Sequence, residues 1–241
     1  MIAVLVPPGG VARGDVVPLP AAEVHHLRVR RAGAAVPVGI RDGEGLVGDG
    51  LLRGEGAAVE VTVERAERLP RPAPLRLAVG AGDRDRFGWL VEKATELGVT
   101  EIIPLETART VGVASRVRSP QLERLRRRAL EAVKQCGAAW APVVHPPMPV
   151  AAFLARAPDG ARWLADAEGE PPPAGFGAGA LTVLVGPEGG FSDTELGEAR
   201  GAGFRPVGFG RQVLRFETAA LAAAACAAAA RLGGLVGGTD G

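Results

Sequence analysis

The sequence predicts an α/β protein with a small β-rich part followed by a larger part in which strands and helices alternate. Three observations support this: the alternation after residue 75, a proline-rich connector at 69–74, and a strand, glycine loop and helix at 181–196. With 241 residues, 47% of them hydrophobic, the chain can bury one large core or two smaller ones. The connector is the best boundary and divides the chain into 1–70 and 71–241.

Residues 1–70 have the pattern of a small β domain. The segment Val36–Ile40 leads into the hairpin-type turn Arg41–Gly45, and strands are expected at Leu46–Leu52 and Ala57–Val63. A helix is expected over Ala21–Arg31. Its outer side carries His25, His26, Arg28, Arg30 and Arg31. Such a face is either simply solvated or in contact with RNA, and the sequence leaves both interpretations open.

The larger part alternates between apolar strands and amphipathic helices. Strands are expected at Leu75–Val79, Glu101–Leu105, near Val143, at Arg162–Ala165, at Leu181–Val185 and at Phe204–Phe209. Helices are expected around Phe87–Leu97, ended by Gly98, and over Pro120–Cys136, and the alanine run Ala219–Ala230 predicts a buried helix. The arginines of the 120–136 helix, including Arg124 and Arg128, form a charged outer face or a phosphate-binding one.

Two loops have the character of ligand-binding loops. Gly186, Gly189 and Gly190 follow an apolar strand, and Ser192 with Glu195 three residues later is the signature of a capped helix start. Glycines allow positive φ and a close approach of a ligand to the main chain. A second loop at 208–219 again lies between a strand and a helix, so the two loops suggest one shared site.

Composition excludes several classes of protein. Basic residues exceed acidic ones by one, so any basic surface is local. Cys136 and Cys226 lie far apart, and the three histidines have no ligand spacing with them, which predicts a reduced intracellular protein without a metal site. The short apolar N-terminus lacks a basic region, and the alanine run is too short to cross a bilayer, so neither a signal peptide nor a membrane span is expected.

Four blocks of the sequence resemble the signature blocks of the RsmE family, in the family's order. They are Lys93–Val99 with Ile103–Leu105, Glu131–Gly137, Val185–Phe191 and Gly210–Ala219. The N-terminal region, with His25-His26-Leu27 and the Asp42-Gly43 turn, is similar to the family's PUA-like β-barrel, so the resemblance covers nearly the whole chain.

The resemblance implies a cytoplasmic enzyme that methylates N3 of a uridine in 16S ribosomal RNA of the small subunit, with S-adenosyl-L-methionine as methyl donor and no metal. It further implies a homodimer whose catalytic domain, 71–241, has the trefoil knot of the SPOUT superfamily, with the PUA-like barrel of residues 1–70 binding RNA.

The resemblance also assigns residues to this site. The cofactor loops would be the end of the 162–166 strand, the 186–190 turn and the 209–219 segment. The expected cofactor-binding residues are Leu164, Val185, Gly186, Glu188, Gly190, Phe209, Gly210, Val213, Leu214, Thr218 and Ala219. The residues expected to bind RNA come from the local arginine clusters and not from the resemblance; they are Arg28, Arg30, Arg109, Arg124 and Arg128.

Methyl transfer needs an oriented uracil and an acceptor for its N3 proton. Arg215 and Glu217 are the catalytic candidates, since a guanidinium can stabilise the uracil anion and a carboxylate can take the proton or orient the arginine. The alternative is a structural ion pair at the start of the last helix.

The chain departs from the family's pattern at Ala108, Ala138 and Phe216. Two other functions therefore stay open: a SPOUT paralogue with a different RNA target, and a non-catalytic RNA-binding module.

Overall fold

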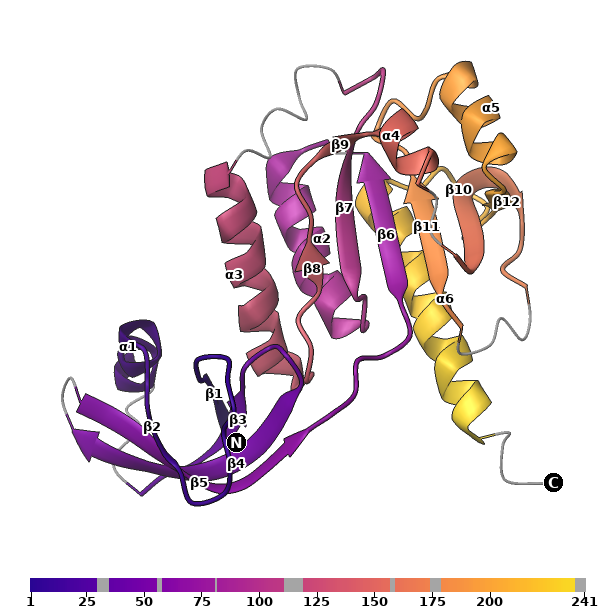
Figure 1. Ribbon diagram of the computed structural model, residues 1–241. Coiled ribbons are helices and arrows are strands. Elements are labelled where there is room, and N and C mark those ends of the chain that lie inside the picture. The colour runs from indigo at the N-terminus through magenta and orange to yellow at the C-terminus, as the bar shows by residue number, and fades with distance from the viewer. Residues whose placement is uncertain are drawn as a thin grey trace. The chain divides into compact units, whose positions relative to one another are not determined.

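The chain folds into two compact units (Figure 1). One comprises Met1–Arg71 and Leu130–Ala141, and the other Pro72–Ala129 and Pro142–Gly241. The computed structural model describes residues 1–29, 35–55, 58–80, 82–110, 119–156, 159–173 and 179–236. The sequence placed the domain boundary at residue 70 and therefore assigned residues 130–141 to the second domain. In the structure these residues belong to the first unit.

The first unit is built on a five-stranded sheet. In chain order its strands are β1 (Ile2–Leu5), β2 (Val16–Pro18), β3 (Pro37–Arg41), β4 (Leu46–Glu55) and β5 (Ala58–Arg68). Their order in the sheet is β1-β3-β4-β5-β2, and every pair is antiparallel except β1 with β3. Within the described residues, edge strands β1 and β2 do not pair with each other, so the sheet is not closed.

Helix α1 (Ala21–Val29) covers the apolar core of this sheet. Its Val24 and Leu27 are buried with Val4, Ile40 and other strand residues. The helix was expected to reach Arg31, but Arg30 and Arg31 lie outside the described residues. The exposed His25 and Arg28 lie on its outer side, as the sequence pattern predicts.

The C-terminal end of helix α3 (Ser119–Cys136) contributes a buried charge to the first unit. Lys134 Nζ lies 2.8 Å from Glu23 Oε1 and 2.8 Å from Glu131 Oε2, and the Lys134 and Glu23 side chains are only 7% and 4% exposed. Glu23 also accepts a hydrogen bond from Leu5 N at 3.2 Å. Burial works to lower the pKa of Lys134, but its hydrogen bonds to Glu131 and Glu23 together raise the pKa above its ordinary value.

The second unit contains a parallel sheet. Its strands are β6 (Leu75–Gly80), β7 (Glu101–Glu106), β8 (Val143–Val144), β9 (Met148–Pro149), β10 (Ala161–Glu170), β11 (Leu181–Val185) and β12 (Arg205–Val207). The strand order is β12-β10-β11-β6-β7-β8, with β9 also pairing with β7, and all recorded pairs are parallel. The protein is therefore an α/β protein with a parallel sheet.

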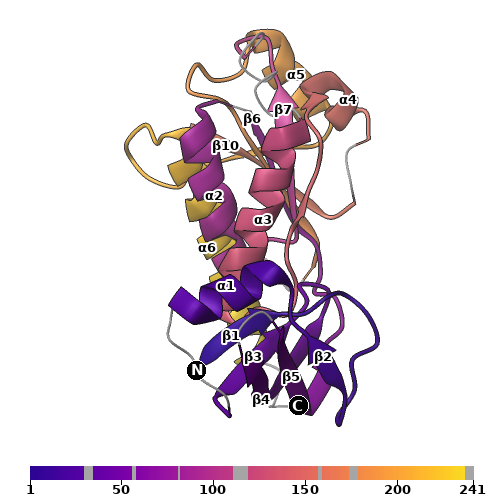
Figure 2. The same ribbon diagram turned by 90° about the vertical axis from the view of Figure 1, so that its left-hand side faces the viewer.

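Helices cover both faces of this sheet (Figure 2). Successive strand residues point to opposite faces, so Leu77 and Val79 pack with α2 (Arg84–Glu96), the first part of α3 and α6 (Phe216–Val236). Ala78 points to the other face and packs with α4 (Val150–Leu154) and α5 (Asp193–Gly201). Since both faces are covered, the central strand β11 is buried along its whole length, which is typical of parallel sheets.

The main elements of the second unit follow the sequence pattern. The N-cap of α5 is Ser192, with the full capping box to Glu195, and Gly98 has a φ of +73° directly after α2. Strand β10 continues to Glu170, into a stretch left unassigned from the sequence. The structure adds β1, β2, β9 and α4, none of which was expected.

Among the described residues, no helix is both long and apolar enough to cross a bilayer. The same part of the chain contains no group of three His, Cys, Asp or Glu residues able to hold a metal ion.

Replacing Lys134 by Met is expected to reduce the free energy of unfolding by about 3–5 kcal/mol, because Glu23 would be left as a buried charge. The matched control is Arg65→Met, which breaks an ion pair with Asp49 whose side chains are 67% and 30% exposed. Its cost should be at most about 1 kcal/mol. Urea unfolding of both variants checks this, and equal losses would contradict the assignment of Lys134 as a buried partner.

Candidate functional site

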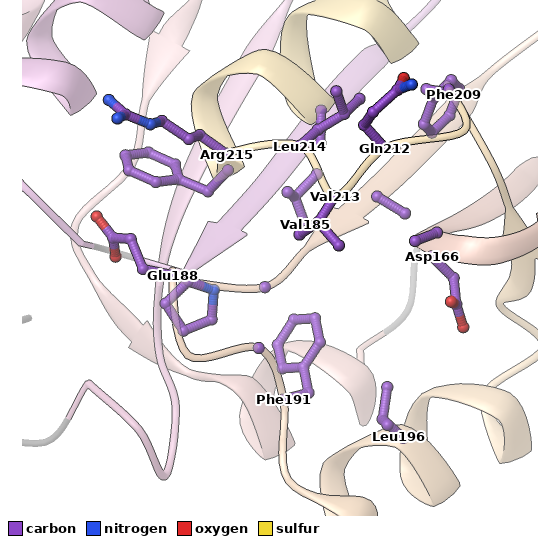
Figure 3. A pocket seen from close by; sticks show the side chains of 18 residues that line it. Asp166, Val185, Glu188, Phe191, Leu196, Phe209, Gln212, Val213, Leu214 and Arg215 are labelled. Carbon is purple, nitrogen blue, oxygen red and sulfur yellow. The ribbon is translucent and has the colours of Figure 1, made fainter.

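A pocket of about 430 Å³ lies in the second unit, next to the ends of strands β10 and β11 (Figure 3). Three separate stretches of chain supply most of its lining: 165–167, 185–191 and 209–216. Leu196 and Ala219 complete it. In an open parallel sheet, ligands bind outside the carboxyl ends of the strands. The 185–191 stretch begins at the end of β11 and the 209–216 stretch follows β12, whereas 165–167 lies within β10.

Strand register brings the stretches together. Leu164 of β10 pairs with Leu184 of β11, and Ala165 pairs with Val207 of β12. On the other side, Val185 pairs with Val79 of β6. Strands β6, β11 and β12 therefore end at one level, beside Ala165 of β10, and β10 continues beyond it to Glu170.

The first loop is a tight turn shaped by close contacts. Gly190 N donates to the Pro187 carbonyl at 2.7 Å, and Gly190 has a φ of +71°, which a residue with a Cβ rarely adopts. A Cβ on Gly186 would lie 3.2 Å from Gly190 Cα, and one on Gly189 would lie 3.3 Å from Arg109 Cδ. Positive φ was expected to be available to all three glycines, but only Gly190 uses it.

Two neighbours hold this loop from outside. Arg109 Nη1 donates to the Gly189 carbonyl. The buried Glu195 carboxylate accepts from Ser192 N at 2.8 Å and from Ala108 N at 2.8 Å, so one side chain caps α5 and also fixes the turn that carries Arg109. Strand β6 ends against the same loop, since a Cβ on Gly80 would lie 2.5 Å from the Pro187 N atom.

The second loop places Arg215 in the pocket and Glu217 outside it. Arg215 is exposed and lines the pocket, whereas Glu217, in the first turn of α6, is not among the residues found to line it. The Glu217 side chain is 9% exposed, and its Oε1 lies 3.9 Å from Arg86 Nε of α2. Its Oε2 is buried and has no hydrogen-bond partner among the described residues.

The pocket gathers most of the residues expected to bind a cofactor. Nine line it: Val185, Gly186, Glu188, Gly190, Phe209, Gly210, Val213, Leu214 and Ala219. Leu164 and Thr218 are not among the lining residues: Leu164 belongs to the apolar core and Thr218 is exposed.

The lining also includes side chains that the sequence did not single out. Asp166, Phe191 and Gln212 are the most informative of them. In Figure 3, Glu188 and Arg215 lie toward one side of the pocket and Asp166 toward the other. Asp166 follows the predicted 162–165 strand directly, and this position could have identified it.

The arginines expected to contact RNA have different surroundings. Arg28 and Arg124 are exposed, and Arg30 lies outside the described residues. Arg109 Nη1 donates to the Gly189 carbonyl. Arg128 Nε lies 3.0 Å from Glu92 Oε2.

Comparison with known proteins identifies the family. Residues 69–228 match the family described as "RNA methyltransferase domain". The chain is 32% identical over 216 residues to the ribosomal RNA small subunit methyltransferase E of Synechocystis sp., an alignment that covers 84% of this chain and 69% of that protein. The chain belongs to the RsmE family of RNA methyltransferases.

Two solved structures have the same fold. The ribosomal RNA small subunit methyltransferase E of Neisseria gonorrhoeae, bound to S-adenosyl methionine, matches with a TM-score of 0.81 and 28% identity, covering 94% of this chain and 96% of that one. A probable rRNA methyltransferase from Porphyromonas gingivalis matches with a TM-score of 0.79 and 29% identity, covering 96% and 99%.

Glu195→Ala should destabilise this RsmE-family protein by about 1–3 kcal/mol, because the buried Glu195 carboxylate would no longer accept hydrogen bonds from Ser192 N and Ala108 N. Glu198→Ala, at an exposed position on the same helix, is the control and should change the free energy of unfolding by less than about 0.5 kcal/mol. Thermal unfolding measures both, and an unchanged stability of Glu195→Ala would show that this carboxylate does not hold the two segments.

Proposed function

We propose that the protein is an S-adenosylmethionine-dependent methyltransferase that modifies N3 of a uridine in 16S ribosomal RNA. Membership of the RsmE family carries this proposal, and the pocket formed by the family's two glycine-bearing blocks supports it. Two of the proteins named above are ribosomal RNA small subunit methyltransferases, and one of these two is bound to S-adenosyl methionine.

The residues of the pocket fit the cofactor. A volume of about 430 Å³ is within the usual range for a small-molecule site. Val185, Phe191 and Leu214 offer apolar surface to an adenine ring, and the main chain of the first loop offers hydrogen-bonding groups. Asp166 and Glu188 place carboxylates in the lining, which suits a ligand with a sulfonium, an ammonium and ribose hydroxyls.

Bound S-adenosylmethionine supplies a methyl group on a positively charged sulfur, which is a strong electrophile. The protein's task is to orient the uracil N3 in line with that methyl group and to accept the N3 proton. Arg215 is exposed at the pocket and can donate to a uracil oxygen as negative charge develops on the ring. Asp166 and Glu188 are the carboxylates of the lining that can take the proton, whereas Glu217, the carboxylate expected from the sequence, does not line the pocket.

The remaining family features are part of the same proposal. The second unit would contain the SPOUT trefoil knot, and the protein would form a homodimer. The first unit would be a PUA-like domain that contacts RNA through Arg28. Arg124, exposed on α3, would contact RNA from the second unit. The proposed enzyme acts in the cytoplasm and needs no metal.

Gly80→Ala should weaken binding of S-adenosylmethionine at least tenfold, because the new Cβ would meet the main chain of Pro187 and displace the first loop. In the control Gly197→Ala, the Cβ has nothing within 4 Å, so affinity should not change. Titration calorimetry measures both. Failure of the unaltered protein to bind S-adenosylmethionine would favour the non-catalytic RNA-binding alternative.

Arg215→Gln should lower kcat for uridine methylation about 10²- to 10³-fold, because charge developing on the uracil would lose its donor. Cofactor affinity should change little. Arg211→Gln is the control, since Arg211 is exposed in the same loop but is not among the pocket-lining residues. The assay is transfer of labelled methyl to 16S RNA followed by nucleoside mass analysis. Equal kcat values for the two variants would remove Arg215 from the mechanism, and methylation of another RNA would favour the paralogue.

A further inference from the structure

The N-terminal turn of α2 contacts both loops of the pocket, although none of its residues is among those that line it. Asp83 N donates to Glu188 Oε1 of the first loop at 3.4 Å. Three residues later, Arg86 Nε lies 3.9 Å from Glu217 Oε1, directly after the second loop. The adjacent rings of Phe87 and Phe216 stack with their centroids 6.5 Å apart.

This turn is itself rigid. Asp83 caps α2, with its carboxylate accepting from Asp85 N at 3.0 Å and Arg86 N at 2.9 Å. The hydrogen bond from Arg86 N is the main cause that lowers the pKa of Asp83. The turn can therefore serve as a fixed base from which the two loops are held at a set separation.

The first loop fits this base closely. The Glu188 carboxylate lies against Gly82, in the space that a Cβ at position 82 would occupy. Glu188 is thus directed to α2 by a hydrogen bond from Asp83 and by contact with Gly82.

The second loop is held through a buried charge. The Glu217 side chain is 9% exposed, and its ion pair is with Arg86, which is 38% exposed. A buried carboxylate depends strongly on its partner, and this one has Oε2 unsatisfied within the described residues, so the guanidinium of Arg86 is its main compensation. Arg215 lies two residues before Glu217 and lines the pocket, so a shift of Glu217 would move Arg215.

We propose that Arg86 and Glu217 are positioning residues for methyl transfer, which set the place of the second loop and of Arg215 relative to the first loop. This inference rests on the proposed function for its catalytic part. In this proposal Glu217 holds the second loop in place and does not accept the N3 proton.

The test compares Arg86→Gln, Glu217→Gln and the double variant with the control Arg84→Gln, whose residue is 54% exposed and is paired with Asp85. Either single change should lower kcat about ten- to hundredfold, because displacement of a catalytic group by about 1 Å has effects of this size. The double variant should be no slower than the slower single variant, since the two residues act as one unit. Arg86→Lys keeps a cation near Glu217 and should restore most of kcat.

The pH profile of kcat separates positioning from proton transfer. If Glu217 only positions the loop, Glu217→Gln keeps the pH profile of the unaltered enzyme. Loss of the acidic limb in Glu217→Gln, with Arg86→Gln nearly fully active, would instead make Glu217 the proton acceptor and overturn the proposal. Variants that change the unfolding temperature but neither kcat nor KM would also overturn it.

Amide hydrogen exchange tests, without any substrate, whether the Arg86–Glu217 pair holds the second loop. Residues 209–215 should exchange faster in Arg86→Gln and Glu217→Gln than in the unaltered protein, and Arg84→Gln should have no effect. Unchanged exchange of residues 209–215 in both variants would refute this holding role even if the enzyme methylates RNA. If the unaltered protein binds no S-adenosylmethionine, the proposed function fails. The exchange result still decides whether Arg86 and Glu217 hold the second loop.

Discussion

The pocket depends on the register of four parallel strands. Because β12, β10, β11 and β6 pair in parallel, the ends of β12, β11 and β6 lie at nearly the same level beside Ala165 of β10, and segments far apart in sequence meet at this edge of the sheet. Each strand is fixed in place by apolar residues on both faces, and a slip by one residue would exchange the two faces. The core of the second unit therefore also determines the geometry of its site.

Short-range patterns in the sequence predicted much of this arrangement. The Ser192 and Glu195 spacing predicted the capping box, and the helices and strands on either side of both loops were predicted within a few residues. Strand β1 was missed because its parallel pairing with β3 depends on residues about 36 positions away. Local propensity carries no information about such a partner.

The partners of the charged residues could likewise not be predicted from the sequence. The sequence could nominate Arg109, Arg128 and Glu217 for function, but it could not show that Gly189, Glu92 and Arg86 are their partners. Nor could it show that Lys134 is buried against Glu23, 111 positions earlier in the chain. Ion pairs of this kind come from the tertiary fold, and they decide whether a charged side chain is free to meet a ligand or is used to hold a loop.

The most direct test of this account is a crystal structure of the protein with S-adenosylmethionine. The account predicts the sulfonium inside the pocket, between the 185–191 loop and the 209–216 loop, with the adenine against the apolar lining and Arg215 at the open side. A cofactor bound elsewhere on the molecule, or a fully ordered pocket that stays empty at saturating cofactor, would contradict the central claim that these two loops form the methyl-donor site.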